Sequence, residues 1–346
     1  MINIYTLEDK ENWIKIVESF KKNDIFYYPE YVDAYKKNGD GEPLLIHYKN
    51  SEFEAINVVI KRDLSLVDKL KKTLKFGELY DFTTPYGYGG ILFSKRTTIK
   101  EKKIFFEEYT DFCKQNGIVA EFVRFNPLLK NHIGMKNVFT IENLGPTVSI
   151  RTKNYDQVWQ DFASKNKNAI RKSIKNGVAI YWGNSTELQA TFKKMYLETM
   201  TKDNANSYYF FSDQYFQSLF TELKYKMKIF YAVYQEKIVS MSIFLFHRNI
   251  VHYHLSASDV NYRDVAPTNL LLLELSKYAA INGYNEIHLG GGLGGKIDNL
   301  YKFKKSFSKS KDYTYVIGKI IFNRKVYDSM TSDLEVDSFF PLYRKE

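Results

Sequence analysis

The segment most suited to chemistry lies near the C-terminus and reads HLGGGLGGKIDNLYKFKKSF over residues 288–307. Leu300, Phe303 and Phe307 recur at helical spacing, so one apolar face holds the segment against the protein. The lysines of the same stretch then point elsewhere; they are Lys302, Lys304 and Lys305. One interpretation is a solvated basic face. The other is a catalytic cation, because acyl transfer requires positive charge near the developing oxyanion.

Three glycines precede these lysines. Gly290, Gly292 and Gly295 form a G-x-G-x-x-G pattern after a predicted strand. A dinucleotide-binding loop would open a helix at once, within an early βαβ unit. Here the pattern lies near the C-terminus and continues into residues 296–298 instead. We therefore expect the glycines to let the backbone turn sharply beside a ligand or a neighbouring strand.

A second basic cluster lies in FASKNKNAIRKSIKNG, residues 162–177. One face of this predicted helix is suited to binding phosphates, and the alternative is an ordinary solvated face. The cations of the cluster fall within three helical turns; they are Lys165, Lys167, Arg171, Lys172 and Lys175.

Three histidines lie on two predicted strands. His252 and His254 alternate in HYHLSAS, and His288 lies on another strand. No Asp or Glu completes a zinc ligand set, so we predict no metal site. His254 is the better candidate for lining a cleft, because the alternation of a strand places Ser256 and Ser258 on its face.

Composition limits the partners. The 346-residue chain carries 50 basic and 40 acidic residues, a net charge of +10, which favours anionic partners such as nucleotides, tRNA, phospholipid headgroups or nucleotide-linked sugars. The single cysteine, Cys113, excludes an internal disulfide framework. No apolar segment has the length of a signal core or a membrane span. We expect a cytoplasmic protein, with peripheral contact to the membrane surface as a further option.

Helical and strand patterns alternate along the whole chain, which indicates an α/β or α+β fold with mixed sheets. A helix is predicted from Thr98 to Gln115, and another from Asp156 to Ser173. A third begins near Thr268, which we expect to cap it. The aromatic stretch FYYPEYVDAY precedes a strand hairpin near the start, and YYFFSDQYFQ precedes a second hairpin later. Two copies of one α/β unit explain this faint repeat and the chain length.

Seven stretches, taken in their order, resemble the Fem family of peptidoglycan aminoacyltransferases, particularly its smaller members without a coiled-coil arm. They are VRFNP, SKNKNAIRKSIKNGV, YQEKIVSMSIFL, YHLSASDVNYRDVAPTNLLLLELSKYA, HLGGG, LYKFKKSF and YTYVIGKIIFNRKVYD. The resemblance implies two tandem GNAT-like acyltransferase domains with mixed central sheets packed across a cleft. We place the N-terminal domain at 1–147 with 319–346, and the catalytic C-terminal domain at 148–318.

The resemblance also implies a reaction and residues for it. Family members move an aminoacyl group from charged tRNA to an amine of a peptidoglycan precursor. The lysine of the family's F-K-x-x-F element faces the reacting carbonyl, and here it is Lys304, after Phe303. Asp298 is the nearest candidate in sequence for a general base. The substrate-binding candidates are Arg124, Asn126, Lys165, Lys167, Arg171, Tyr209, Tyr215, Tyr253, His254 and Phe303.

Three departures from the family pattern bear on the acceptor. Asn126 replaces an aspartate of the cleft, residues 208–211 replace the substrate-grasping arginine with aromatics, and Asp33 stands near the position of an early lysine. An aromatic platform suits a sugar or a weakly charged amine better than a phosphorylated peptide precursor. The acceptor is therefore a peptidoglycan precursor or a nucleotide-sugar.

The donor also has two candidates, aminoacyl-tRNA and acyl-CoA, each as a co-substrate rather than a tightly bound cofactor. GNAT proteins that use acetyl-CoA hold its pyrophosphate in a glycine-bearing loop at a helix N-terminus. The corresponding stretch here, residues 261–269, contains no glycine, which favours aminoacyl-tRNA. The alternative is an acyl-CoA-dependent N-acetyltransferase for amino sugars. A third possibility is a catalytically silent module that binds RNA or membrane phosphates.

Overall fold

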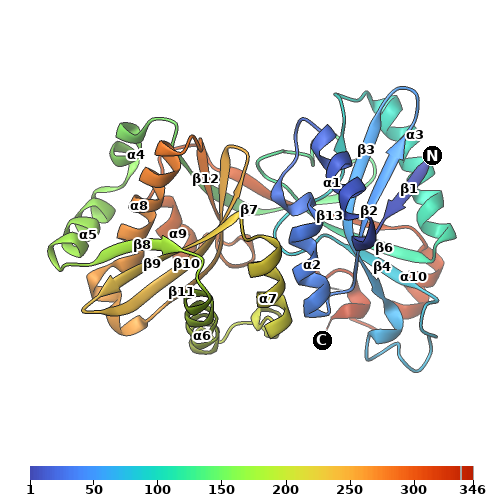
Figure 1. Ribbon diagram of the computed structural model, residues 1–346. Helices are drawn as coiled ribbons and strands as arrows, with labels where there is room; N and C mark the ends of the chain where they lie inside the picture. The colour runs from blue at the N-terminus through green and yellow to red at the C-terminus, as the bar shows by residue number, and fades with distance from the viewer. Residues whose placement is uncertain (336, 346) are drawn as a thin grey trace. The chain divides into compact units, whose positions relative to one another are not determined.

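The computed structural model describes residues 1–335 and 337–345 of the chain. Figure 1 shows helices and strands interleaved along the whole chain. The chain divides into two compact units. The first unit comprises Met1–Asn143 and Tyr315–Glu346, and the second comprises Leu144–Thr314.

The first unit is built on one mixed sheet. Neighbouring strands pair antiparallel except β4 with β6, which are parallel. A short strand, β5 (Leu92–Phe93), pairs with β3 outside this order. The strands lie in the order β1 (Ile2–Tyr5), β2 (Glu42–Lys49), β3 (Glu54–Asp63), β4 (Tyr80–Thr83), β6 (Ile118–Phe125) and β13 (Tyr313–Ile321).

The helices of the first unit start and stop at recognisable signals. α2 has a proline at its N-terminus and ends at Gly39, whose φ of 91° suits a residue without a side chain. Thr98 caps α3 in a capping box with Glu101. Figure 1 shows α1 and α2 on one side of the sheet and α3 on the other. The helices are α1 (Lys10–Ser19), α2 (Pro29–Asn38), α3 (Ile99–Gln115) and α10 (Arg324–Thr331).

The second unit repeats the same sheet. Its strands pair antiparallel except β11 with β12, which are parallel. The order is β8 (Ala179–Gly183), β9 (Met227–Tyr234), β10 (Lys237–His247), β11 (Ile250–Ser258), β12 (Glu286–Gly290) and β7 (Thr140–Arg151). The two aromatic stretches of the faint repeat form α2 and α7, each followed by the antiparallel hairpin expected of it. The prediction of two α/β units with mixed sheets is confirmed.

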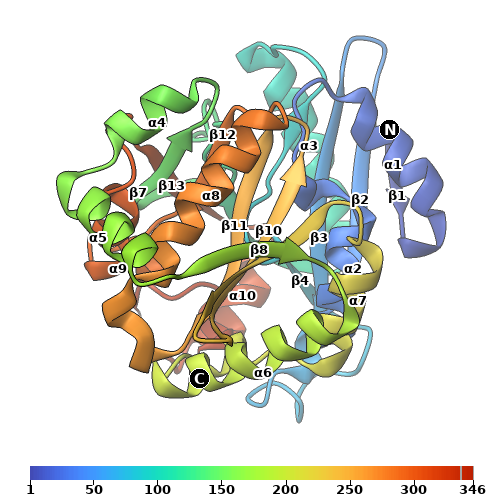
Figure 2. The same cartoon turned by 60° about the vertical axis from the view of Figure 1, so that its left-hand side comes forward.

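Two groups of helices cover the second sheet. Figures 1 and 2 show α4, α5, α8 and α9 on one side, with α6 and α7 on the other. The first group encloses the main apolar core of the unit, which includes Phe244, Leu271 and Phe307. The helices are α4 (Tyr155–Asp161), α5 (Ser164–Lys175), α6 (Thr186–Lys202), α7 (Asp213–Glu222), α8 (Pro267–Ile281) and α9 (Asn299–Lys305).

Two local predictions for this unit are wrong. The helix expected from 156 to 173 is broken, because Phe162 adopts an extended conformation and packs its ring edge-on against Phe307, 5.1 Å away. Thr268 does not cap α8: the cap position is Ala266, in the left-handed region at φ 50°, and Pro267 opens the helix. Tertiary packing decides the first case and the fixed φ of proline suits the second.

Candidate acyl-transfer site

The site is organised by the parallel pair of strands in the second sheet, β11 and β12. β11 and β12 pair at three positions, from Ile250 with Glu286 to His252 with His288. β12 then continues along β7 as far as Gly290, whereas β11 continues along β10. The parallel ladder therefore ends two residues before the Gly-rich turn. Ligands of open α/β sheets bind at the carboxyl ends of parallel strands, and this end is where the structure places Lys304.

Lys304 lies close to both strands at that end. It is 9% exposed, and its Nζ donates a hydrogen bond of 2.7 Å to the carbonyl oxygen of Gly291, just beyond β12. The same Nζ lies 6.0 Å from the ring centroid of Tyr253 on β11. Burial lowers the pKa of Lys304 to about 8, although the charge of Asp298 opposes the shift. A lysine in this state is still mostly an ammonium at neutral pH, and it is poorly hydrated.

The Gly-rich turn serves close packing rather than phosphate binding. A Cβ on Gly292 would overlap the carbonyl of Lys296 and the carboxylate of Asp298. Gly295 has a φ of 86°, and a Cβ there would lie 2.9 Å from the backbone of Leu144. The predicted close approach to a neighbouring strand is thus what the structure shows, since Leu144 belongs to β7.

Asp298 holds α9 in place. Its carboxylate accepts hydrogen bonds of 2.8 Å from the backbone N–H groups of Tyr301 and Leu293. These bonds lower the pKa of Asp298, with Tyr301 contributing most. A carboxylate already used by two donors, with a lowered pKa, is a weak proton acceptor. The geometry therefore favours a capping role for Asp298 over the general base suggested by its position in the sequence.

A bulge on β11 determines which face of the sheet each polar side chain of this strand lies on. Tyr253 pairs with Phe244 and Leu255 with Ile243, so His254 has no partner position on β10. Such an extra residue shifts the alternation of the strand. Ser256 consequently lies on the Tyr253 side, where its hydroxyl is 3.0 Å from that of Ser242. The prediction that His254 shares a face with Ser256 is wrong.

Tyr253 lies on the same side as Lys304. Burial raises the pKa of its hydroxyl, and hydrogen bonds with Ser256 and Ser242 partly offset this effect. Further along β10, the hydroxyl of Ser240 lies 3.0 Å from that of Thr268 at the start of α8. Hydroxyl groups thus extend from the ammonium of Lys304 toward α8. Ser240 and Ser242 were not predicted, and the S-x-S spacing in SMS, repeated in SAS, was the available signal.

His254 and Tyr215 form a buried pair beside α7. The Tyr215 hydroxyl lies 3.1 Å from Nε2 of His254, and the ring of Phe211 stacks on Tyr215 with centroids 4.2 Å apart. Burial, followed by the charge of His252, lowers the pKa of His254 to about 3. The imidazole is therefore neutral at physiological pH. Tyr209, nearby in the chain, accepts a hydrogen bond of 3.0 Å from the Tyr196 hydroxyl through its carbonyl.

The cations of the basic helix α5 differ in their surroundings: some are simply exposed, and others lie near an aromatic ring. Lys165 and Lys172 are exposed. Lys167 and Arg171 lie 5.8 and 5.6 Å from the indole ring of Trp159, and Lys167 also donates to the carbonyl of Gln160 at 3.3 Å. Cations held around an aromatic ring form an ordered positive surface. Such a surface suits the phosphates of a substrate, and phosphate binding by this helix stays a prediction.

The start of α8 is covered by α5. Nδ2 of Asn269 donates a hydrogen bond of 3.1 Å to Oδ1 of Asn166, which is 4% exposed. Pro267 supplies no N–H to this helix end. The side chain of Asn269 in the first turn of α8 is therefore already engaged by α5.

The candidates in the first unit and Phe303 have structural contacts. Arg124 lies 4.8 Å from the ring of Phe122 and donates to the carbonyl of Thr84 at 3.4 Å. Asn126 is fully buried, and its Nδ2 donates a 2.7 Å hydrogen bond to Asp24. Phe303 packs against Phe307, 5.1 Å away, in the core of the second unit.

Within residues 1–335 and 337–345, no group of three or more His, Cys, Asp or Glu side chains is arranged to hold a metal ion. The helices in the same described range also include none that is long and apolar enough to cross a membrane.

Comparisons with known proteins bear on the fold of the chain. Residues 164–305 match the model of the acetyltransferase (GNAT) domain. The crystal structure of FemX aligns with a TM-score of 0.66 at 14% identity, covering 95% of this chain and 99% of that one. No curated protein sequence matches the chain.

Two further solved structures share the fold. The C-terminal domain of a putative lysylphosphatidylglycerol synthetase from Agrobacterium fabrum gives a TM-score of 0.58 at 10% identity, covering 92% of this chain and 93% of its own. A tandem GNAT protein from the clavulanic acid pathway gives 0.53 at 6% identity, covering 93% and 99%. The second unit thus contains a match to the GNAT acetyltransferase domain, and the chain as a whole shares the fold of FemX and of these two structures.

Proposed function

We propose that this acyltransferase moves an aminoacyl group from aminoacyl-tRNA to an amine of a cell-wall or envelope precursor, in the cytoplasm and close to the membrane surface. The observation that carries the proposal is the buried ammonium of Lys304 at the end of the parallel ladder, between Gly291 and Tyr253. The peptidoglycan precursor and the nucleotide-sugar are the two acceptor classes.

The chemistry follows from the placement of Lys304. The acceptor amine attacks the ester carbonyl of the aminoacyl group, so a C–N bond forms and the carbonyl oxygen becomes an oxyanion. The ammonium stabilises that oxyanion in a site with little water. The C–O bond to the ribose then breaks, and the proton lost by the amine ends on the departing hydroxyl. The product is an amide, and no oxidant or metal takes part in this balance.

Two features support aminoacyl-tRNA as the donor. The α5 surface around Trp159 suits the phosphates of an RNA. The first turn of α8 is occupied by the Asn166–Asn269 contact and opened by Pro267, which disfavours a bound pyrophosphate. The alternative, an acyl-CoA-dependent N-acetyltransferase acting on an amino sugar, is favoured by the match to the GNAT acetyltransferase domain.

The test offers both donors to the same protein. Purified protein would be incubated with radiolabelled aminoacyl-tRNA or acetyl-CoA and an amine acceptor, either UDP-linked muramyl peptide or UDP-linked amino sugar. We expect label from aminoacyl-tRNA to enter the acceptor as an acid-stable amide. Transfer from acetyl-CoA alone would establish the alternative. Salt-sensitive binding that does not distinguish charged from uncharged tRNA, without transfer, would mean a silent binding module.

A further inference from the structure

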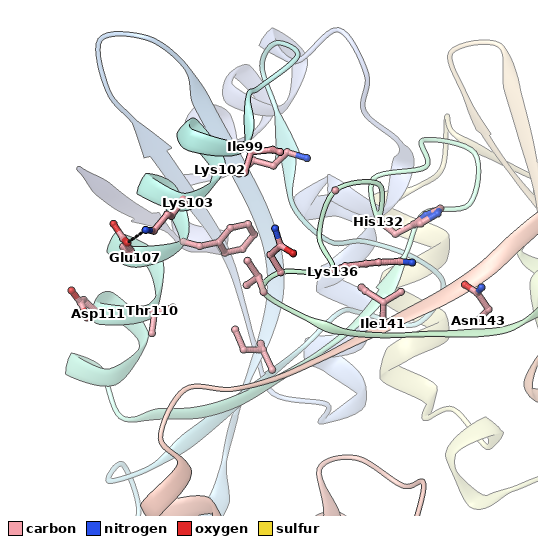
Figure 3. Close-up of a pocket in the computed structure, with 15 residues that line it drawn as sticks. Ile99, Lys102, Lys103, Glu107, Thr110, Asp111, His132, Lys136, Ile141 and Asn143 are labelled. Carbon is pink, nitrogen blue, oxygen red and sulfur yellow. Dashed lines mark ion pairs between the residues drawn. The ribbon is translucent and has the colours of Figure 1, made fainter.

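The first unit contains a pocket of about 1010 Å³ that none of the candidate site residues line. Figure 3 shows α3 on one side of it and the segment carrying His132, Lys136, Ile141 and Asn143 on the other. The volume is that of sites that enclose a sizeable organic ligand. Residues from Ile99 to Asp111 line the pocket along one stripe of α3, a distance of about 18 Å at the helical rise.

The walls of the pocket are already formed. On the loop side, the N–H of Met135 donates to the carbonyl of His132 at 3.1 Å, and that of Val138 donates to Met135 at 3.0 Å. Nζ of Lys102 reaches from α3 to the carbonyl of Ile133 at 3.1 Å. A ligand would therefore not need to order this loop, and the entropic cost of binding is correspondingly reduced.

The interior combines an aliphatic floor with cations. Phe106 is buried at the floor, and Val138, Ile141 and Ile320 continue it. Lys102, Lys136 and His132 line the same space, and the exposed Lys103, Glu107 and Asp111 line it as well. Burial lowers the pKa of Lys102, and no other cause contributes. An ammonium that has lost water gains more from an anion than an exposed one does.

His132 adds a polar atom with unused capacity. Its Nδ1 is buried and has no hydrogen-bond partner among the described atoms. Burial, followed by the charge of Lys130, lowers the pKa of His132, so the ring is neutral and can donate from Nδ1. An unsatisfied buried donor costs free energy that a ligand oxygen would recover.

The lining also argues against two ligand classes. Apart from the imidazole of His132, the described lining residues offer a single aromatic ring, Phe106, and it is 5% exposed. No face is left for a nucleobase or a sugar ring to stack on. The aliphatic side chains of the lining, among them Val138, Ile141 and Ile320, fit an extended aliphatic body.

We propose that this pocket binds an aliphatic amphiphile with one anionic head group, a carboxylate or a phosphate. The head would lie against Lys102, Lys136 and His132, and the chain would lie along α3 over Phe106 and Ile141. This proposal does not rest on the transfer reaction, and it gives the first unit a ligand of its own.

The test measures binding of dodecyl phosphate and dodecanoate to the full chain by calorimetry, below their micelle concentrations. Dodecanoate represents free fatty acids, and dodecyl phosphate represents lipid phosphates. We expect saturable binding of at least one of them, and the probe that binds more tightly identifies the head group. Inorganic phosphate and dodecyltrimethylammonium should not bind, since each lacks half of the recognised chemistry.

Matched variants locate the site. Lys136→Met and Lys102→Met should each weaken binding about tenfold, the scale of a charge-assisted hydrogen bond. Ile141→Trp should block the chain and abolish binding. Lys114→Met is the control, because Lys114 lies on the same helix, is exposed and does not line the pocket; it should bind within about twofold of wild type.

Three results would overturn the proposal. They are no saturable binding of either anionic probe, equal binding of the cationic amphiphile, and unchanged affinity in both Lys136→Met and Ile141→Trp. Lys136 is exposed, so its variant keeps the test decisive even where Lys102→Met folds poorly.

Discussion

The two units use the same sheet differently at the end of their parallel strands. In the first unit, the chain beyond β4 continues the ladder along β6: the N–H of Thr84 donates to Phe122 at 3.1 Å, and that of Gly89 donates to Arg124 at 2.7 Å. Residue 89 also bridges to Phe125. In the second unit, the ladder between β11 and β12 ends at His252 and His288, and Lys304 lies beyond it.

The carboxyl end of the parallel ladder is therefore built differently in the two copies of the repeated fold. Protein backbone fills the carboxyl end of the first ladder, and Arg124 there contacts Phe122 and Thr84. The corresponding end of the second holds a buried lysine, Lys304, whose Nζ has no carboxylate at hydrogen-bonding distance among the residues that the structure describes. The cost of burying such a charge is tolerated at sites where it has a function.

The largest expected effect is on catalysis in the second unit. Lys304→Ala should lower kcat about 100- to 1,000-fold, as for the loss of one oxyanion donor. Lys302→Ala is the matched control, since Lys302 lies on the same helix and is exposed, and it should stay within about twofold of wild type. Circular dichroism and thermal melts would show both variants folded. Near-normal turnover in Lys304→Ala would refute the assigned role.

The next effect concerns the first unit. Asn126→Asp restores the aspartate of the Fem pattern, and it places a second carboxylate against Asp24, which is fully buried. Two like charges there should destabilise the protein by about 3 kcal/mol at pH 8, and less at pH 5, where one carboxyl holds a proton. Chemical denaturation at both pH values measures it. Equal stability of the variant and wild type at pH 8 would mean that Asn126 is not a structural residue.

Glu121 gives the first unit a pH dependence. The carboxylate is fully buried and accepts hydrogen bonds from Asn57 at 2.7 Å and Tyr109 at 2.9 Å. Burial raises its pKa from 4.5 to about 7, although both hydrogen bonds lower it. The folded state therefore holds a proton that the unfolded state has lost between these values, and stability falls as pH rises through that window.

Glu121→Gln removes this titration. Relative to wild type, the variant should gain up to about 3 kcal/mol of stability between pH 5 and pH 8. Oδ1 of Asn57 is buried without a partner, so it can accept from the new amide. Denaturation curves at the two pH values test this. A constant difference between variant and wild type would show that Glu121 does not titrate in this range.

The smallest expected effect tests whether Asp298 is a helix cap or a general base. Asp298→Asn keeps a good capping residue, so kcat should change by about threefold or less, a loss of well under 1 kcal/mol. Steady-state assays at pH 7 measure it, with Asp298→Ala as the comparison that loses the cap as well. A loss as large as that of Lys304→Ala would return Asp298 to the role of general base.

Much of the fold is readable from local signals. Thr98 and Glu101 mark the start of α3, and the two aromatic stretches before hairpins indicate the repeated unit. Predictions from local patterns were wrong where a strand or a helix is interrupted. The alternation around His254 is broken by a bulge, and Phe162 interrupts a helical pattern to reach Phe307. Neither event is visible in a window of neighbouring residues, because long-range contacts decide both.

The site shows the same limit. Lys304 was predicted from its motif, but its burial, its bond to Gly291 and its lowered pKa depend on β11 and β12 meeting in space. Asn126 was predicted as a substrate-binding residue from its motif, but its burial and its bond to Asp24, 102 residues earlier in the chain, could not be.

The central claim, that the protonated Lys304 stabilises the oxyanion, is tested most directly by the pH dependence of Lys304→Arg relative to wild type. The pKa of Lys304 is about 8, whereas arginine stays charged throughout. As pH rises from 7 to 9.5, wild type loses its ammonium, so the ratio of variant kcat to wild-type kcat should rise about tenfold or more. Titration of the acceptor amine cancels in this ratio. A ratio that falls across the same range would mean that Lys304 acts as a neutral base, and would contradict the account.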